Sequence, residues 1–79
     1  MIRVVVTDDH PRLRQALSFI LSRNPGISVV AECSDGEEAF RAASQHRPDV
    51  ILMDINMQPV NGITATERIS KTIPGVRIV

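Results

Sequence analysis

The 79-residue sequence has few aromatic residues and no net charge. Phe19 and Phe40 are its aromatic residues, and tryptophan and tyrosine are absent. Proteins that bind single-stranded nucleic acid stack bases on aromatic side chains, so the sequence disfavours that class. Nine basic and nine acidic residues cancel, so no overall positive field attracts DNA or an anionic membrane. We therefore expect no direct nucleic-acid contact by this segment.

Cysteine and long apolar runs are also scarce. Cys33 is the single cysteine, which excludes an intramolecular disulfide and favours a small buried side chain. The apolar run at the N-terminus is too short for a signal peptide. No run reaches the roughly 20 residues that span a membrane. These absences predict one small domain, without membrane contact, in a reducing cytoplasm.

Short β-branched segments alternate with helical patterns along the chain. We expect strands over residues 2–6, 27–33, 50–53 and 76–79. Helices are expected from Pro11 to the Asn24-Pro25-Gly26 stop, from Gly36 to near His46, and from Gly62 to about Thr72. The βαβαβαβ order predicts a parallel sheet with helices on its faces. The alternating second strand is expected at a sheet edge.

Helical periodicity also predicts which side chains face the core. The first helix has an apolar stripe formed by Leu13, Ala16, Leu17, Ile20 and Leu21. Its other face is expected in solvent and consists of Arg12, Arg14, Gln15, Ser18 and Ser22. Ser34 and Glu37 fit a capping box for the second helix, whose inner residues are Gly36, Ala39, Phe40 and Ala43. The third helix is expected to bury Ala65, Ile69 and Ile73.

Three acidic residues follow the ends of two predicted strands. Asp8 and Asp9 end the first strand, and Asp54 follows the buried run Val50–Met53. Right-handed crossovers place the carboxyl ends of parallel strands along one edge, where ligands bind. Converging carboxylates repel unless a cation such as Mg²⁺ joins them, and a carboxylate can itself accept a phosphoryl group. Each acid alone is more often a helix cap or turn residue, so spacing leaves both interpretations open. His10, beside the acids, is expected to be a capping or surface residue rather than a ligand.

Several segments together resemble the receiver domain of two-component response regulators. They are Val-Val-Val-Thr-Asp-Asp-His-Pro (4–11), Asp-Gly-Glu-Glu-Ala (35–39), Pro-Asp-Val-Ile-Leu-Met-Asp-Ile-Asn-Met (48–57), Asn-Gly-Ile (61–63) and Pro-Gly-Val-Arg-Ile-Val (74–79). The Asp-Asp-His-Pro start most resembles the subgroup whose receiver precedes a helix-turn-helix DNA-binding output domain. The resemblance covers the whole chain and implies a flavodoxin-like fold with sheet order 2-1-3-4.

The resemblance also assigns roles to residues. Asp54 would be the phosphoacceptor, with a histidine kinase as the donor, and the domain would be a signalling module rather than an enzyme. Mg²⁺ would be bound by Asp9 directly, by Asp8 largely through water, by Asp54, and by the backbone carbonyl of Asn56. One departure from the family is Met57-Gln58-Pro59, where the proline stands one position late. We interpret it as a tolerated loop variant.

A second departure concerns length. Receiver domains have five strand–helix units, with a Ser or Thr after the fourth strand and a Lys after the fifth, whereas this sequence reaches Val79 within the expected fourth strand. Residues 1–79 are therefore expected to be the N-terminal portion of one receiver domain. Lys71, on the third helix, does not replace the missing lysine. An open fourth strand and a partly exposed Leu13–Leu21 stripe would make this segment marginally stable, or favour a homodimer or strand-exchanged oligomer.

Two alternative functions remain open. The first is a pseudo-receiver that acts through protein contacts without phosphorylation. The second is a Mg²⁺-dependent hydrolase of small phosphoesters, but such enzymes use an Asp-x-Asp pair on one strand. Here Asn56 stands two residues after Asp54, so the general acid would be missing.

Overall fold

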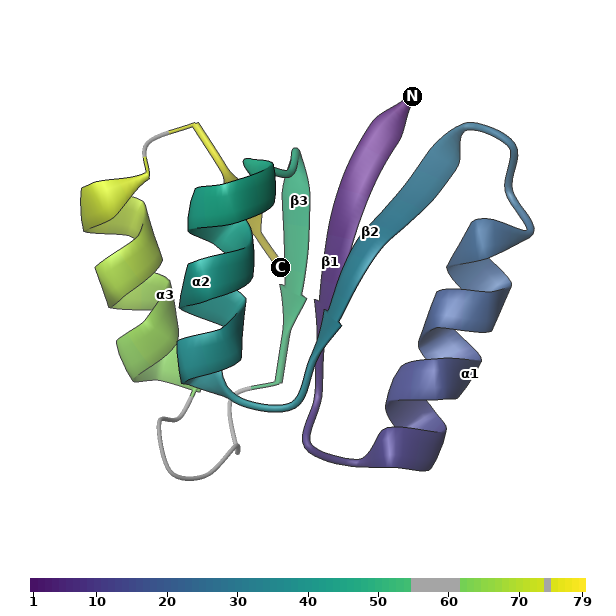
Figure 1. Cartoon of the computed structure of the whole chain (residues 1–79), viewed down its shortest axis with the longest axis horizontal. Helices are drawn as coiled ribbons and strands as arrows, with labels where there is room; N and C mark the ends of the chain where they lie inside the picture. The colour runs from purple at the N-terminus through teal and green to yellow at the C-terminus, as the bar shows by residue number, and fades with distance from the viewer. Residues whose placement is uncertain (55–61, 74) are drawn as a thin grey trace.

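The computed structural model describes residues 1–54, 62–73 and 75–79. The strands are β1 (Ile2–Thr7), β2 (Ile27–Cys33), β3 (Val50–Met53) and β4 (Arg77–Ile78). The helices are α1 (Pro11–Ser22), α2 (Gly36–His46) and α3 (Gly62–Thr72). Figure 1 shows α1 on one face of the sheet and α2 with α3 on the other. Each predicted strand and helix is confirmed, although β4 is shorter than expected.

The four strands form one parallel sheet in the order β2-β1-β3-β4. This order confirms the flavodoxin-like expectation, and it places β2 at a sheet edge, as its alternating sequence predicted. The central pairing aligns Val4 with Val50 and Thr7 with Met53, so Asp8 and Asp54 leave the sheet at the same level. The register of β1 against β2 shifts between Val4 and Val5.

The main core lies between the sheet and the α2–α3 layer. Its largest completely buried side chains include Val5, Ile51 and Ile69. Ala65, Ile69 and Ile73 of α3 are buried, as their helical spacing predicted. Outside the core, Arg68 of α3 forms an ion pair with Glu37 and its guanidinium carbon lies 4.1 Å from the ring centroid of Phe40. These contacts join α3 to α2 outside the apolar core.

Helix α1 confirms the partial exposure expected for the Leu13–Leu21 stripe, but its inward face differs in part from the predicted one. Ser18 is buried and the Arg14 side chain is 18% exposed, whereas Leu13 and Ile20 are 50% and 64% exposed. The prediction that Arg14 and Ser18 face solvent is therefore wrong. The inward face follows the spacing i, i+3, i+4 and i+7 and consists of Arg14, Leu17, Ser18 and Leu21. Arg14 can lie inside because its aliphatic stem packs while its guanidinium finds polar partners.

Helix α2 begins at Gly36 as predicted, but its capping residues each lie one position later than expected. Asp35, rather than Ser34, is the N-cap, and its carboxylate accepts a hydrogen bond from the Glu38 backbone N–H at 2.8 Å. Glu38, rather than Glu37, reaches back and accepts from the Ser34 N–H at 2.8 Å. Both Ser and Asp can cap, so the Ser34-Asp35 pair allowed two registers. Glu37 is instead occupied by the ion pair with Arg68.

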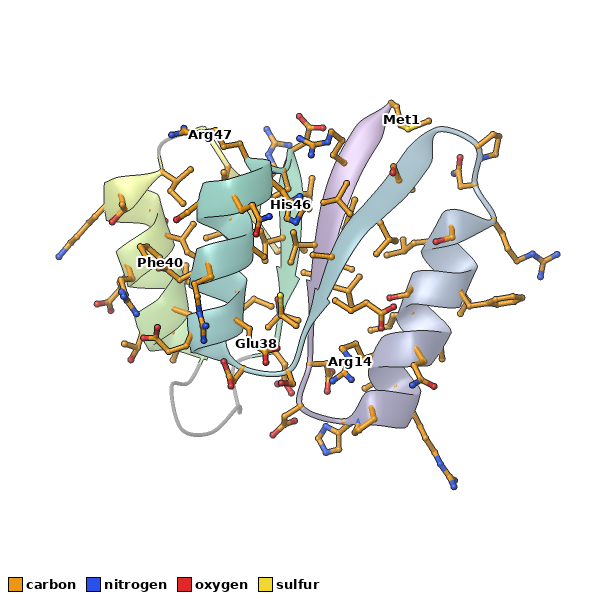
Figure 2. The ribbon with its side chains drawn as sticks, in the orientation of Figure 1. Met1, Arg14, Glu38, Phe40, His46 and Arg47 are labelled. Atoms are coloured by element: carbon orange, nitrogen blue, oxygen red, sulfur yellow. The ribbon has the colours of Figure 1, made fainter. Side chains whose placement is uncertain are left out.

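The other end of α2 is tied to the central strand. Arg47 has the left-handed φ of 45° and ends the helix. The Arg3 guanidinium of β1 donates to the carbonyl of His46 at 2.5 Å. This cation satisfies a carbonyl that the helix itself leaves without a partner. Arg3, a charged residue in an otherwise mostly apolar strand, thus binds the end of α2 at which Figure 2 shows His46 and Arg47.

Candidate metal centre

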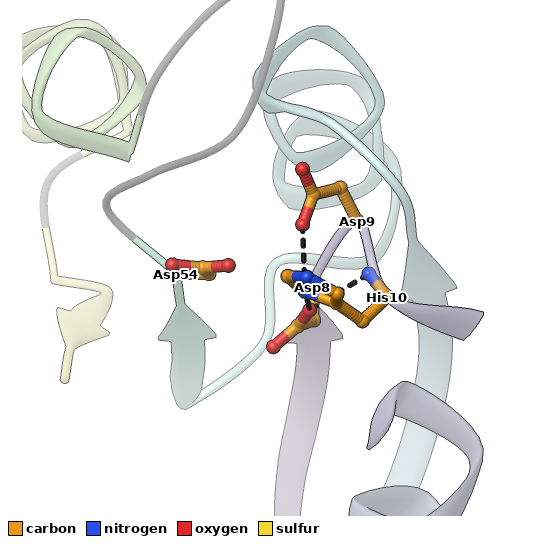
Figure 3. Close-up of side chains that lie close together, drawn as sticks. All are labelled: Asp8, Asp9, His10 and Asp54. Atoms are coloured by element: carbon orange, nitrogen blue, oxygen red, sulfur yellow. Dashed lines mark hydrogen bonds and ion pairs between the residues drawn. The ribbon is translucent and has the colours of Figure 1, made fainter. Parts of the chain in front are cut away.

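The acidic site is built by the carboxyl ends of the two central strands. The Asp54 backbone N–H donates to the Thr7 carbonyl at 3.1 Å, which extends the β1–β3 pairing by one step. The Asp8 N–H donates to the Cys33 carbonyl at 3.0 Å on the other side. These bonds fix the backbone of Asp8 and Asp54 to the sheet. Figure 3 shows Asp54 at the end of β3, facing Asp8 and Asp9 in the turn after β1.

Four side chains come together at this edge. Asp8, Asp9, His10 and Asp54 each offer one ligand atom, and these atoms lie within 4.8 Å of one another. Their exposure differs, since the side chains of Asp8, Asp9 and His10 are 9%, 33% and 71% exposed. The predicted convergence of the three acids is confirmed. Asn56 and Met57-Gln58-Pro59 lie outside the described residues, so the expected carbonyl ligand and the loop variant stay predictions.

His10 makes contacts that its position in the sequence did not suggest. It occupies the N-cap of α1, but its side chain does not cap the helix. Its backbone N–H instead donates to Asp8 Oδ1 at 2.8 Å, and Nδ1 of its ring lies 3.0 Å from both Asp8 Oδ1 and Asp9 Oδ1. The hydrogen bond to Asp8, followed by the charges of the nearby carboxylates, raises the pKa of His10 above its ordinary value of 6.5.

This contact had a signal in the sequence. An aspartate whose carboxylate accepts the N–H two residues later forms an Asx turn. Asp8 and His10 have that spacing, and the turn brings the ring back over the acids. The expectation that His10 is a capping or surface residue is confirmed, since it is exposed and occupies the N-cap position of α1, although its side chain makes no capping hydrogen bond.

Arg14 of α1 supports the backbone of the acidic site. Nη1 of Arg14 donates to the Asp8 backbone carbonyl at 2.9 Å, and its Nε lies 3.6 Å from Glu32 Oε1 on β2. Arg14 therefore connects α1, the turn after β1 and the edge strand β2. Because it binds the carbonyl and not the carboxylate, the Asp8 side chain stays available to the site. This role of Arg14 could not be predicted from local sequence, since Glu32 becomes its neighbour only through the pairing of β1 with β2.

The donor set suits a small, hard divalent cation. Three carboxylates from two strands supply the oxygen ligands that Mg²⁺ takes in proteins. Without a cation their charges repel, and Nδ1 of the His10 ring lies 3.0 Å from one oxygen of Asp8 and one of Asp9. The arrangement can therefore hold a divalent ion beside the Asp54 carboxylate. His46 and Lys71, on α2 and α3, do not belong to this group of side chains.

None of the helices in the part of the chain that the structure describes is long and apolar enough to cross a bilayer.

Comparison with known proteins identifies the family. The family model of the response regulator receiver domain matches residues 4–79. The protein-glutamate methylesterase/protein-glutamine glutaminase of Nitrosospira multiformis is 50% identical over 74 residues, which are 94% of this chain and 21% of that protein. The transcriptional regulatory protein DegU of Brevibacillus brevis is 43% identical over 77 residues, which are 98% of this chain and 33% of that protein.

A solved structure supports the same family assignment. The response regulator domain of Thermotoga maritima CheB is 41% identical, with a TM-score of 0.93 over 99% of this chain and 57% of that domain chain. The chain thus spans between a fifth and a third of these two curated relatives. Parallel strands in the order β2-β1-β3-β4, with acids at their carboxyl ends, agree with the sequence match. The chain belongs to the response regulator receiver domain family, the signalling module of two-component systems.

Proposed function

We propose that this receiver accepts a phosphoryl group on Asp54 from a histidine kinase, with Mg²⁺ held by Asp8, Asp9, Asp54 and the Asn56 carbonyl. The observation that carries the proposal is the convergence of the three carboxylates at the carboxyl edge of the sheet. A carboxylate beside a bound divalent ion is a competent phosphoryl acceptor. Family membership supports this partner, since receivers generally take their phosphoryl group from a phosphohistidine.

Several residues of this chain would have separate roles in the phosphoryl transfer. An Asp54 carboxylate oxygen attacks the phosphorus, the new O–P bond forms, and the P–N bond to the kinase histidine breaks. The imidazole leaves with the electron pair of that bond and takes up a proton. Mg²⁺, when bound, would offset the charge of the transferring group. Asp8 and Asp9 would hold the ion, and the backbone hydrogen bond from Asp54 to Thr7 fixes the position of the acceptor residue.

We further propose that residues 1–79 are the first part of a longer receiver domain. The solved receiver from Thermotoga maritima extends beyond the part that this chain matches, since the match covers 57% of it. In the family, the hydroxyl and the lysine that bind the phosphoryl group follow the fourth and fifth strands. A phosphorylated Asp54 would therefore depend on residues after Val79 to shift the conformational equilibrium of the domain.

The output of the whole protein has two candidates. Transcription control is supported by the likeness to DegU and by the Asp-Asp-His-Pro start. Methylesterase activity is supported by the 50% identical relative, whose name describes an enzyme. We favour transcription control in the cytoplasm. In the full-length protein, phosphorylation-dependent retention of genomic DNA fragments would support it, and release of methanol from methylated receptor glutamates would instead establish the enzyme.

Intact mass spectrometry tests the phosphoacceptor. The full-length protein is incubated with acetyl phosphate and Mg²⁺, beside Asp54→Asn and Asp9→Asn variants. We expect one phosphoryl adduct on the wild type, none on Asp54→Asn and a slower gain on Asp9→Asn. Absence of an adduct on the wild type would favour the pseudo-receiver. Turnover of a generic phosphoester that survives Asp8→Ala but not Asp54→Ala would favour the hydrolase.

A further inference from the structure

We propose that Arg14 and Glu32 form a positioning pair that sets the Mg²⁺ affinity of the receiver. The pair acts through the peptide group between Asp8 and Asp9, the two acids that follow β1. The inference rests on the proposed function of this sheet edge, and it adds to that function one residue on α1 and one on the edge strand β2. The pair thereby sets the Mg²⁺ concentration at which Asp54 accepts a phosphoryl group.

The first argument is the bond that Arg14 makes to the backbone. Its Nη1 donates to the Asp8 carbonyl oxygen at 2.9 Å. A carbonyl group and the N–H group that follows it lie in one rigid plane, so this bond fixes the orientation of the whole Asp8–Asp9 peptide. The Asp8 N–H is held on its other side by the Cys33 carbonyl at 3.0 Å. Because both of its peptide groups are held, Asp8 has a fixed backbone from which to present its carboxylate, and Asp9 begins from a fixed plane.

The second argument is the way the guanidinium itself is held. Arg14 Nε lies 3.6 Å from Glu32 Oε1, and these side chains are 18% and 41% exposed. A guanidinium carries its donors in one rigid plane, so Glu32 at the Nε end orients the Nη1 end toward the Asp8 carbonyl. Figure 2 shows Arg14 between α1 and the carboxyl ends of β1 and β2. An ion pair this exposed adds little to stability, so its contribution is orientation.

The third argument is the register shift in β2, which brings Glu32 to the correct face of the sheet. Val4 pairs with Val29 but Val5 pairs with Ala31, so β2 has one extra residue between these pairs. Beyond the shift, Val6 pairs with Glu32.

The extra residue determines which helix layer Glu32 faces. Val5 belongs to the core against α2 and α3, and neighbouring residues of a strand point to opposite faces, so Val6 and Glu32 face α1. Without the shift Glu32 would pair with Thr7 and face the other layer, away from Arg14. Such irregularities often re-aim a side chain beside a functional site.

Charge and position make opposite predictions for the loss of Arg14. A nearby cation repels Mg²⁺, so removal of the Arg14 charge would tighten Mg²⁺ binding if charge alone mattered. Removal of a positioning residue instead frees the Asp8–Asp9 peptide to turn, and Mg²⁺ binding weakens. Partners of metal ligands contribute about 10–100-fold to metal affinity, and we expect the lower end because Arg14 acts through the backbone.

Mg²⁺ titrations of the full-length protein, followed by backbone amide shifts in NMR spectra, distinguish the two. We expect Arg14→Met to raise the Mg²⁺ dissociation constant by about tenfold. Arg14→Lys keeps the charge but loses the rigid set of donors, so it should also weaken binding, and it serves as the second variant where Arg14→Met is unstable. Arg12→Met is the matched control, since it removes the same charge from an exposed position of the same helix and should not weaken binding.

A double-variant cycle tests whether Glu32 acts through Arg14. Glu32→Gln should weaken Mg²⁺ binding less than Arg14→Met does, because Arg14 keeps its bond to the Asp8 carbonyl. In the Arg14→Met background, Glu32→Gln should weaken binding by a smaller factor than it does in the wild type, since the two residues are coupled. Equal factors in both backgrounds would show that Glu32 acts by its charge alone and would overturn its part in the pair.

The Mg²⁺ dependence of phosphorylation gives a readout that a structural role would not change. The rate of adduct formation with acetyl phosphate is measured by intact mass at a series of Mg²⁺ concentrations. In Arg14→Met the half-saturating Mg²⁺ concentration should rise, while the rate at saturating Mg²⁺ stays near that of the wild type, because Asp54 is held by Thr7. Unchanged or tighter Mg²⁺ binding in either Arg14 variant would overturn this inference alone. Failure of the wild type to bind Mg²⁺ or to gain an adduct would overturn the proposed function as well.

Discussion

The charge of His10 is set by the two acids that its ring contacts. Nδ1 lies 3.0 Å from an oxygen of Asp8 and of Asp9, and the hydrogen bond to Asp8 raises its pKa. We expect an NMR titration of the ring in metal-free protein to give a pKa above 6.5. Asp9→Asn removes one of the charges and should lower it. A pKa of His10 at or below 6.5 in the wild type would contradict the ion pair.

The same contact has a defined effect on stability. Because the folded pKa of His10 is raised, the folded state holds this proton more tightly than the unfolded state does. The contribution is complete below 6.5 and is lost as the pH rises through the folded pKa. Urea unfolding of the metal-free protein at several pH values should therefore show the wild type losing this advantage over His10→Gln at higher pH. The opposite trend would mean that the ring is held in its neutral form.

Cys33 is expected to be unreactive in the folded protein. Burial, with smaller effects from Glu38 and Asp35, raises the pKa of its thiol to about 11. At pH 7 about one thiol in ten thousand is then ionised, against a few per cent for a free cysteine. Labelling with a disulfide reagent should be slow until urea unfolds the chain. Labelling of the folded protein at the rate of a free thiol would show that this end of β2 opens.

At the scale of elements, the cap of α2 offers a test of register. Asp35 accepts the Glu38 N–H, whereas the Ser34 hydroxyl contacts only the Glu38 carboxylate. Asp35→Ala should cost about 1 kcal/mol of unfolding free energy, as losses of N-cap side chains do. Ser34→Ala is the matched control and should cost less. Urea denaturation measures both, and a larger loss at Ser34 would restore the register predicted from the sequence.

Strands and helices were predictable because their signals are local. The apolar run of β3 and the spacing of Ala65, Ile69 and Ile73 in α3 determine those elements without knowledge of their neighbours. The inward face of α1 was not predictable in this way. Arg14 turns inward because it meets the Asp8 carbonyl and Glu32, and Glu32 is brought there by the pairing of β1 with β2. Local periodicity does not contain that partner.

The candidate site likewise has a part that could be predicted from the sequence and a part that could not. The meeting of Asp8 and Asp9 with Asp54 follows from parallel strands and right-handed crossovers, so topology alone predicts it. The position of the His10 ring depends on an Asx turn, which is a local pattern that competes with helix capping. Sequence position alone placed His10 at the start of a helix, whereas the structure shows its ring turned to the acids.

For the whole molecule, the buried layer between the sheet and α2–α3 carries much of the stability. Ile51 of β3 is completely buried within it. Ile51→Val should cost about 1 kcal/mol and Ile51→Ala about 2–5 kcal/mol, because the second change also leaves a cavity. Marginal stability of small domains makes the larger loss enough to unfold much of the protein. Thermal unfolding followed by circular dichroism measures the difference, and equal losses would indicate that the neighbours of Ile51 relax into the space.

The surface of these 79 residues is expected to promote association. β2 and β4 are the two edges of the described sheet, and Ile20 and Ile63 are more than half exposed. Open edges and apolar side chains favour pairing between chains. A polypeptide of residues 1–79 should show a molar mass that rises with concentration in size-exclusion chromatography with light scattering. A constant 8.7 kDa species at all concentrations would contradict this expectation.

The position of β1 also has a consequence for synthesis on the ribosome. β1 is the first strand to be made, and it lies between β2 and β3 in the finished sheet. Each later strand therefore meets a partner that has already emerged: β2 joins one side of β1, β3 joins the other, and β4 is added to β3. The sheet can grow outward from its oldest strand at the pace of translation. No strand needs to be inserted between two that are already paired.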